Sequence, residues 1–103
     1  MNREQTARRS HNGGYSCASA VYSAFNDVVN GSAPIPRSEG GKCGAVLAAE
    51  KVLKQMCLDS VAFDRQFILQ YGSVKCDDLR RPRHSCNDLV GTAARMTSEA
   101  LGR

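Results

Sequence analysis

Residues 43–56 read CGAVLAAEKVLKQM, and this stretch decides the fold class. Its apolar residues recur at the spacing of one helix face: Val46, Leu47, Ala49, Val52, Leu53 and Met56. Alanine, leucine, glutamate and lysine also have high intrinsic helix propensity. We therefore expect a helix from about Cys43 to Met56. No segment of the chain shows the sustained alternation of a β-strand.

Three further segments carry a helical pattern. Residues 17–29, 61–71 and 86–101 are expected to be helices, and Ser73 is expected to cap a short helical turn that holds Cys76. Ser16 and Ser85 are typical N-cap residues. The sequence thus predicts an all-α fold, a small helical bundle of about four main helices plus a short helical turn.

The length of 103 residues fits one domain, and 42% hydrophobic residues suffice for a core without disulfides. Aromatic residues are few and tryptophan is absent, so we expect a mostly aliphatic, alanine-rich core. Residues 1–13 are polar and are expected to form a flexible arm. Residues 14–103 are expected to form a single helical domain that holds the cysteines.

The charge and hydropathy of the chain argue against two classes of partner. The net charge is only +4, and the basic clusters at 8–9 and 80–83 contain no aromatic residues, so nucleic-acid binding is not expected. No run approaches the roughly 20 apolar residues of a membrane span. Arg8-Arg9 is followed by polar residues, which does not fit an export signal. We expect a cytoplasmic protein, in which thiols stay reduced.

Four of the five cysteines lie where a helix is expected to begin: Cys17, Cys43, Cys76 and Cys86. Free backbone N–H groups and the helix dipole favour the thiolate at such positions. Cys57 lies at the end of a predicted helix and is expected to be a core residue. An odd number of cysteines without a C-x-x-C pair argues against a disulfide scaffold and against a zinc ribbon.

Histidine offers little further chemistry on the sequence alone. His84 precedes Cys86 by two residues and is expected to be a solvated loop residue, and His11 lies in the polar arm and is expected to be inert. Tyr15 is expected either to cover Cys17 or to pack against the first helix.

The cysteine pattern resembles a known family. Residues 14–21 (GYSCASAV), 43–46 (CGAV), the segment around Cys76, and residues 86–90 (CNDLV) are similar to the redox-active protein family with the C_GCAxxG_C_C motif. The resemblance extends from about Gly13 to Ala94 and selects the same four cysteines. It differs from the motif at Ala48, which stands in place of the final glycine. The resemblance implies a small helical protein whose cysteines undergo redox chemistry or hold a redox centre.

Three functional hypotheses follow from these residues. In the first, an oxidoreductase-like protein uses a thiol–disulfide pair: Cys43 attacks, because flanking glycines expose it, and Cys17 or Cys86 resolves the product. In the second, Cys17, Cys43, Cys76 and Cys86 are ligands of an iron–sulfur cluster or of zinc. In the third, the chain is a helical interaction module without redox chemistry. The expected partner is a redox protein, and a second copy of the chain is a further candidate.

Overall fold

The computed structural model describes residues 2–28, 38–39, 42–75, 78–79 and 85–102. Most of them belong to five helices: α1 (Arg3–Asn12), α2 (Cys17–Ser23), α3 (Gly44–Gln55), α4 (Ser60–Tyr71) and α6 (Cys86–Leu101). Two short strands, β1 (Ser38–Glu39) and β2 (Lys42–Cys43), pair antiparallel with Ser38 opposite Cys43. The predicted all-α fold is confirmed.

The helices begin and end at residues that the sequence marks. The Ser16 hydroxyl accepts a hydrogen bond from the Ser19 N–H at 3.2 Å, and the Ser85 hydroxyl accepts one from the Asp88 N–H at 3.1 Å. Asp59 caps α4 in the same way through the Val61 N–H. Gly72 ends α4 with a φ of 88°, a conformation that residues with a Cβ rarely adopt.

The helix α2 is shorter than the predicted segment 17–29. It ends at Ser23, and residues 24–28 continue as turns in which each bonded N–H reaches three residues back, as from Val28 to the Phe25 carbonyl. The Ala24 carbonyl, which a longer helix would use for residue 28, instead accepts a hydrogen bond from Arg3 at 2.7 Å. Contact with the N-terminal helix therefore replaces the last turn of the predicted helix.

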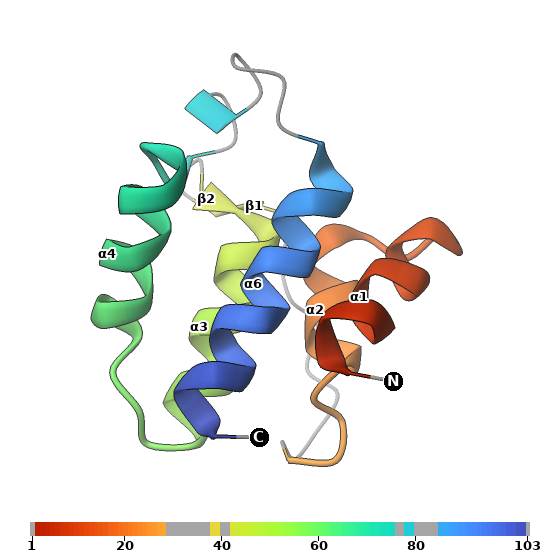
Figure 1. Ribbon diagram of the computed structural model, residues 1–103, viewed down its shortest axis with the longest axis horizontal. Helices are drawn as coiled ribbons and strands as arrows, with labels where there is room; N and C mark the ends of the chain where they lie inside the picture. Colours follow the sequence, from red (N-terminus) through yellow and green to blue (C-terminus); the bar gives the residue numbers. More distant parts are fainter. Residues whose placement is uncertain (1, 29–37, 40–41, 76–77, 80–84, 103) are drawn as a thin grey trace.

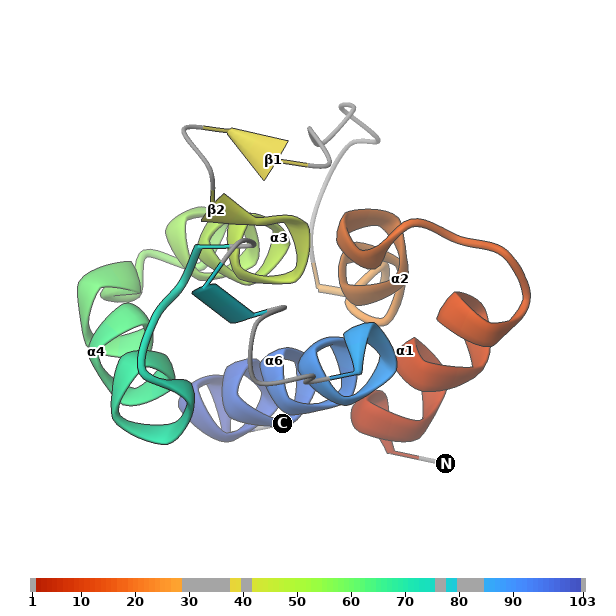
Figure 2. The same ribbon diagram turned by 90° about the horizontal axis from the view of Figure 1, so that it is seen from above.

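The predicted flexible arm over residues 1–13 is wrong for most of its length. Residues 3–12 form α1, capped by the Asn2 side chain, which accepts from the Gln5 N–H at 2.8 Å. Figure 2 shows α1 lying beside α6. Ala7 is fully buried, and Arg3 pairs with Asp27 at 2.7 Å. The helix is polar almost throughout, so the apolar pattern of the sequence does not reveal it.

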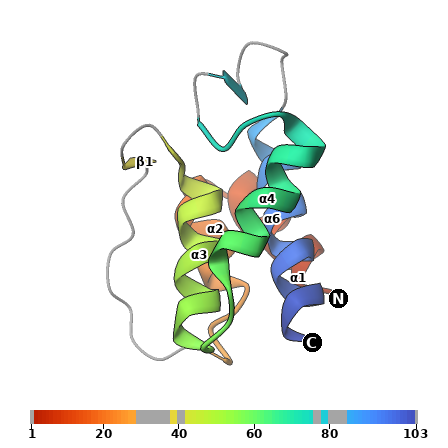
Figure 3. The same cartoon turned by 90° about the vertical axis from the view of Figure 1, so that its left-hand side faces the viewer.

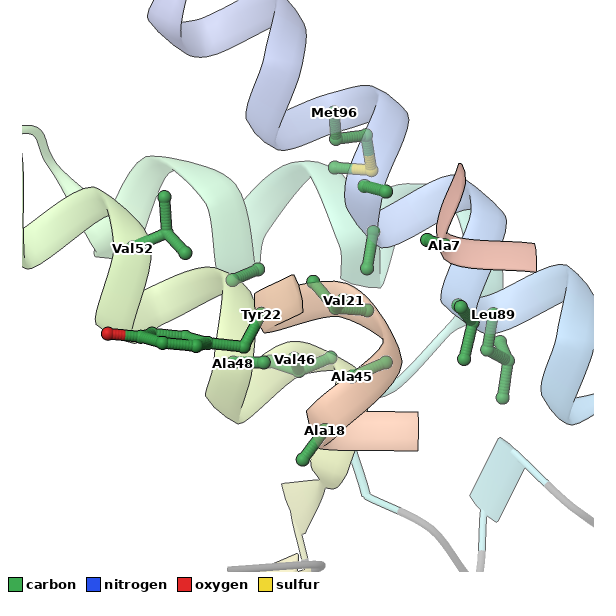
Figure 4. Close-up of a cluster of buried hydrophobic side chains, with 14 of the residues drawn as sticks. Ala7, Ala18, Val21, Tyr22, Ala45, Val46, Ala48, Val52, Leu89 and Met96 are labelled. Carbon is green, nitrogen blue, oxygen red and sulfur yellow. The ribbon is translucent and has the colours of Figure 1, made fainter. Parts of the chain in front are cut away.

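The core lies between the helices, with α3 packed against α2, α4 and α6 (Figure 1). It is mostly aliphatic and alanine-rich, as predicted; nine alanines from α1, α2, α3, α6 and the turn after α2 are buried. Val21 of α2 lies close to Ala45 and Val46 of α3 in Figure 4. Tyr22 is buried at the same junction, and its hydroxyl accepts a hydrogen bond from Gln55 at 2.9 Å. Small side chains allow the helices to approach closely.

The helix α4 is buried on one side only: it lies at the left-hand edge of the bundle in Figure 1 and in front of the other helices in Figure 3. Phe63 and Phe67 face the core, and the Tyr71 hydroxyl lies 2.7 Å from the Thr92 hydroxyl of α6. Ile68 is 43% exposed, and Leu69 is 87% exposed. Because α4 packs against α3 and α6 on one side only, apolar side chains such as Val61 and Leu69 are left exposed on its outer side.

Candidate functional site

The structure brings the Cys17 thiol next to the imidazole of His11. Cys17 is the first residue of α2, and His11 is in the last turn of α1. A turn through Gly13 and Gly14 reverses the chain between them, and Gly14 has a φ of 107°. As a result Cys17 Sγ lies 3.7 Å from His11 Nε2, within hydrogen-bonding distance for sulfur. Both side chains are partly buried.

A second contact orients the imidazole from its other side. The Asn87 side-chain amide, in the first turn of α6, lies 3.3 Å from His11 Nδ1. The same amide nitrogen lies 3.1 Å from the Arg8 carbonyl and 3.1 Å from Asn12 Oδ1, so its two hydrogens are shared among three acceptors. The sulfur, the imidazole and the amide thus form a chain of contacts across α2, α1 and α6.

The contact between His11 and Cys17 was not predicted from the sequence, because residues 1–13 were expected to form a flexible arm in which His11 is inert. The signal that could have found it is the short polar turn His11-Asn12-Gly13-Gly14 followed by a capped cysteine. Two successive glycines allow a tight reversal, and a reversal at that point returns Cys17 to the end of the preceding segment. The contact can be predicted from this turn only if residues 3–12 are also predicted to form a helix.

Cys43 does not have the exposure predicted from its glycine neighbours. Its residue exposure is 4%, and it belongs to the core cluster. It is the N-cap of α3 rather than the first helical residue, and its backbone N–H donates to the Val74 carbonyl at 2.8 Å. The β1–β2 pairing and the segment around Val74 cover it, so the expectation of an exposed attacking sulfur at Cys43 is wrong.

Cys86 is the first residue of α6, as predicted, and its side chain is exposed. Ser85 caps the helix immediately before it. Figure 1 shows that α3 and α6 begin at the same end of the molecule, so Cys43 and Cys86 mark the same end of the bundle. Cys76 and His84 lie outside the described residues.

Cys57 is exposed, so the prediction of a core residue is wrong. It follows α3 with a φ of 60°, and its N–H donates to the Lys54 carbonyl at 3.1 Å. The next N–H, of Leu58, donates to the Leu53 carbonyl at 2.8 Å. These two bonds form a Schellman motif, which turns the chain away from the helix and leaves the cysteine in solvent.

A separate charged cluster joins β2, α3 and α4 at a partly buried position. Lys42 Nζ lies 2.6 Å from a Glu50 carboxylate oxygen and 3.1 Å from an Asp64 carboxylate oxygen. Burial, with the neighbouring Asp64 carboxylate, raises the pKa of Glu50 despite the opposing effect of Lys42. The other Asp64 oxygen is buried and has no hydrogen-bond partner. Because Lys42 already lies between the two carboxylates, we interpret the cluster as a structural ion pair.

The ligand set predicted for a metal is not assembled within the described part of the chain. Among those residues, no three His, Cys, Asp or Glu side chains are gathered so that they could hold a metal ion. The four cysteines that the structure describes are all outside disulfides. Ligation of an iron–sulfur cluster or zinc by four cysteines stays a sequence prediction, since Cys76 is not among the described residues.

Within the described residues, none of the helices combines the length and the apolar composition that crossing a bilayer requires.

Comparison with known proteins gives no relative: no protein family, no curated protein and no solved structure matches this chain. The similarity of its cysteine pattern to the C_GCAxxG_C_C motif is therefore a hypothesis from the sequence.

Proposed function

We propose that the protein is a thiol redox protein that carries out thiol–disulfide exchange, with Cys17 as the attacking sulfur. The observation that carries the proposal is the 3.7 Å contact between Cys17 Sγ and His11 Nε2. A hydrogen bond donated to sulfur stabilises the thiolate relative to the thiol, and the thiolate is the nucleophile. The resemblance of residues 14–21 to a redox-active family supports the same choice.

The proposed reaction needs only the sulfur chemistry of disulfides. The Cys17 thiolate attacks one sulfur of a small disulfide R–S–S–R′, forms the mixed disulfide of Cys17 with R, and releases R′–S⁻. The thiolate of a second small thiol then attacks the mixed disulfide and regenerates the Cys17 thiolate. Each exchange breaks one S–S bond and makes one, so electrons balance. Attack by the exposed Cys86 thiolate on Cys17 Sγ of the mixed disulfide would instead release R–S⁻ and leave a Cys17–Cys86 disulfide.

The contacts of His11 favour a hydrogen-bond donor over a general base. A general base for Cys17 would need its lone pair on Nε2. The amide nitrogen of Asn87, which can only donate, faces Nδ1, so the lone pair of the neutral ring belongs on Nδ1. The ring proton then belongs on Nε2, where it points at the sulfur. This arrangement suits a stabilised thiolate, which is what disulfide exchange requires.

The test compares the rates at which the cysteines react with bis(2-hydroxyethyl) disulfide, a small neutral probe. Trypsin places each of the five cysteines on a different peptide, so mass spectrometry of quenched samples follows every site separately. Exposure alone would make Cys57 and Cys86 react first, because Cys17 is only partly exposed. We expect Cys17 to react first at neutral pH.

The variant His11→Leu removes the hydrogen bond to sulfur, and Cys57→Ser is the matched control at a distant exposed thiol. A hydrogen bond to a charged group contributes about 1.5–3 kcal/mol, and the gain in thiolate is partly offset by lower nucleophilicity. We therefore expect His11→Leu, which has no donor at this position, to slow Cys17 about threefold to tenfold and Cys57→Ser to leave its rate unchanged. Reaction of Cys17 no faster than Cys57 and Cys86 in the unmodified protein would overturn the proposal.

A further inference from the structure

We propose that Arg8 is a positioning residue that fixes the tautomer of His11, and that it acts through the side-chain amide of Asn87. The inference deepens the proposed function and rests on it, because the tautomer decides which ring nitrogen presents a proton to Cys17. Arg8 contacts Asn87, and Asn87 in turn contacts the imidazole. Its effect follows from the hydrogen bonds that hold the amide.

The orientation of the Asn87 amide is determined by groups that have only one hydrogen-bonding role. Arg8 Nη1 lies 3.2 Å from Asn87 Oδ1, and a guanidinium can only donate. Asn87 Nδ2 lies 3.1 Å from the Arg8 backbone carbonyl, which can only accept. The same arginine therefore satisfies both ends of the amide, and rotating the amide by 180° would oppose donor to donor and acceptor to acceptor.

The orientation of the amide then determines the protonation of the imidazole. Asn87 Nδ2 lies 3.3 Å from His11 Nδ1 and has no lone pair to offer, so a proton on Nδ1 would face the amide hydrogens, and Nδ1 is assigned as the unprotonated nitrogen. A neutral imidazole with Nδ1 as acceptor carries its proton on Nε2. His11 Nε2 is the atom that faces Cys17 Sγ at 3.7 Å.

The Arg8 guanidinium is held in place from three sides. It pairs with Asp88 at 2.9 Å and with Glu4 at 3.1 Å. Its third side packs against α6 at Gly91, where a Cβ would overlap the guanidinium. Glycine inside a helix costs about 1 kcal/mol relative to alanine, and here it leaves the room that Arg8 occupies.

The test reads the His11 tautomer directly from the ¹⁵N chemical shifts of its ring nitrogens, measured at a pH where the ring is neutral. The only other histidine is His84, and a His84→Gln background removes its signals. In that background we expect a single tautomer with Nε2 protonated. Arg8→Ala removes the donor to Asn87 Oδ1 but keeps the backbone carbonyl that accepts from Nδ2, so we expect the Nδ1 and Nε2 signals to move part of the way toward an average of the two tautomers. Arg95→Ala is the matched control, an arginine that pairs with Glu99 elsewhere on α6, and should move neither signal.

Two further variants keep the test decisive if Arg8→Ala folds poorly. Gly91→Ala displaces the guanidinium without removing it, and should shift the signals in the same direction as Arg8→Ala. Asn87→Asp replaces the donor at Nδ1 with an acceptor, and should reverse the tautomer so that Nδ1 carries the proton. An unchanged Nε2-protonated tautomer in the folded Arg8→Ala or Gly91→Ala protein, or in Asn87→Asp, would overturn the role of Arg8.

The tautomer measurement does not depend on any reaction of the thiol, so the two proposals fail separately. If the tautomer follows Arg8 but Cys17 is not the fastest thiol, the thiol-exchange function is wrong and the positioning role stands. If Cys17 is the fastest thiol but its rate in Arg8→Ala and the tautomer are both unchanged, the positioning role is wrong and the function stands.

Discussion

At the scale of single residues, Cys57 occupies a backbone conformation that suits a glycine. Its φ of 60° lies in the left-handed region, at the position after α3 where a Schellman motif usually places glycine. A residue with a Cβ pays about 1–2 kcal/mol for that conformation. Glycine would avoid this cost but would lose about 0.5–1 kcal/mol more backbone entropy on folding.

We therefore expect Cys57→Gly to raise the free energy of unfolding by about 0.5–1 kcal/mol, the balance of these two terms. Urea unfolding followed by circular dichroism measures the change. Cys57→Ala is the control, since it removes the thiol but keeps the Cβ. Equal stability of the glycine and alanine variants would contradict the conformational explanation.

For the cysteines and for His11, the sequence predicts positions within helices but not burial or contacts. The sequence places Cys17 and Cys86 correctly at helix starts, because a capping serine precedes each of them. It does not reveal the burial of Cys43, which depends on β2 and on the distant Val74 carbonyl. It also does not pair Cys17 with His11, because that contact depends on the direction of the turn between two helices.

At the scale of elements, the ion-pair cluster of Lys42, Glu50 and Asp64 ties β2 and α4 to α3. Glu50 has a residue exposure of only 7%, and burial raises its pKa. In the unfolded chain this carboxyl returns to its ordinary value of about 4.3. Between the two pKa values the folded state binds the extra proton, so the contribution of Glu50 to stability falls as pH rises through that interval.

We expect the stability of the unmodified protein, relative to Glu50→Gln, to decrease as pH rises above about 4, the ordinary pKa range of a glutamate. The glutamine variant has no carboxyl to titrate at this position, so the difference isolates Glu50. Urea unfolding at a series of pH values measures it, with Glu99→Gln as the control for loss of an exposed carboxylate. A difference that grows with pH would contradict the sign argued here.

Sequence patterns predict the elements better than the contacts between them. The bounds of α3, α4 and α6 agree with the predicted segments to within about one residue, since apolar periodicity and capping residues are local signals. The cluster around Lys42 was not predicted, because its partners lie 8 and 22 residues away on two other elements. The end of α2 was also missed, because the carbonyl of Ala24 is taken by Arg3 from α1.

At the scale of the whole molecule, α1 is part of the folded bundle rather than an appendage. Ala7 is fully buried against its neighbours, and Arg3 and Arg8 reach the turn after α2 and the start of α6. The interface between α1 and the bundle has a small side chain, Ala7, at its centre and the polar contacts of Arg3 and Arg8 at its edges. Such an interface leaves only one buried apolar residue within α1, which explains why composition suggested a mobile arm.

Because Ala7 is buried, we expect Ala7→Glu to lower the free energy of unfolding by about 3 kcal/mol or more, the cost of an uncompensated buried charge. Gln5→Glu places the same side chain on the exposed face of α1 and should change stability by no more than about 0.5 kcal/mol. Urea unfolding of the two variants gives the comparison. An Ala7→Glu protein as stable as Gln5→Glu would show that α1 is not packed on the bundle.

The distribution of tyrosines has a practical consequence for spectroscopy. The chain has three tyrosines and no tryptophan, so its ultraviolet emission comes from tyrosine alone. Tyr22 is buried where α2 meets α3 and Tyr71 bridges α4 to α6, whereas Tyr15 is 54% exposed two residues before Cys17. The protein therefore carries native optical reporters of its core and one beside its candidate thiol, and each can be isolated by phenylalanine replacement without an added dye.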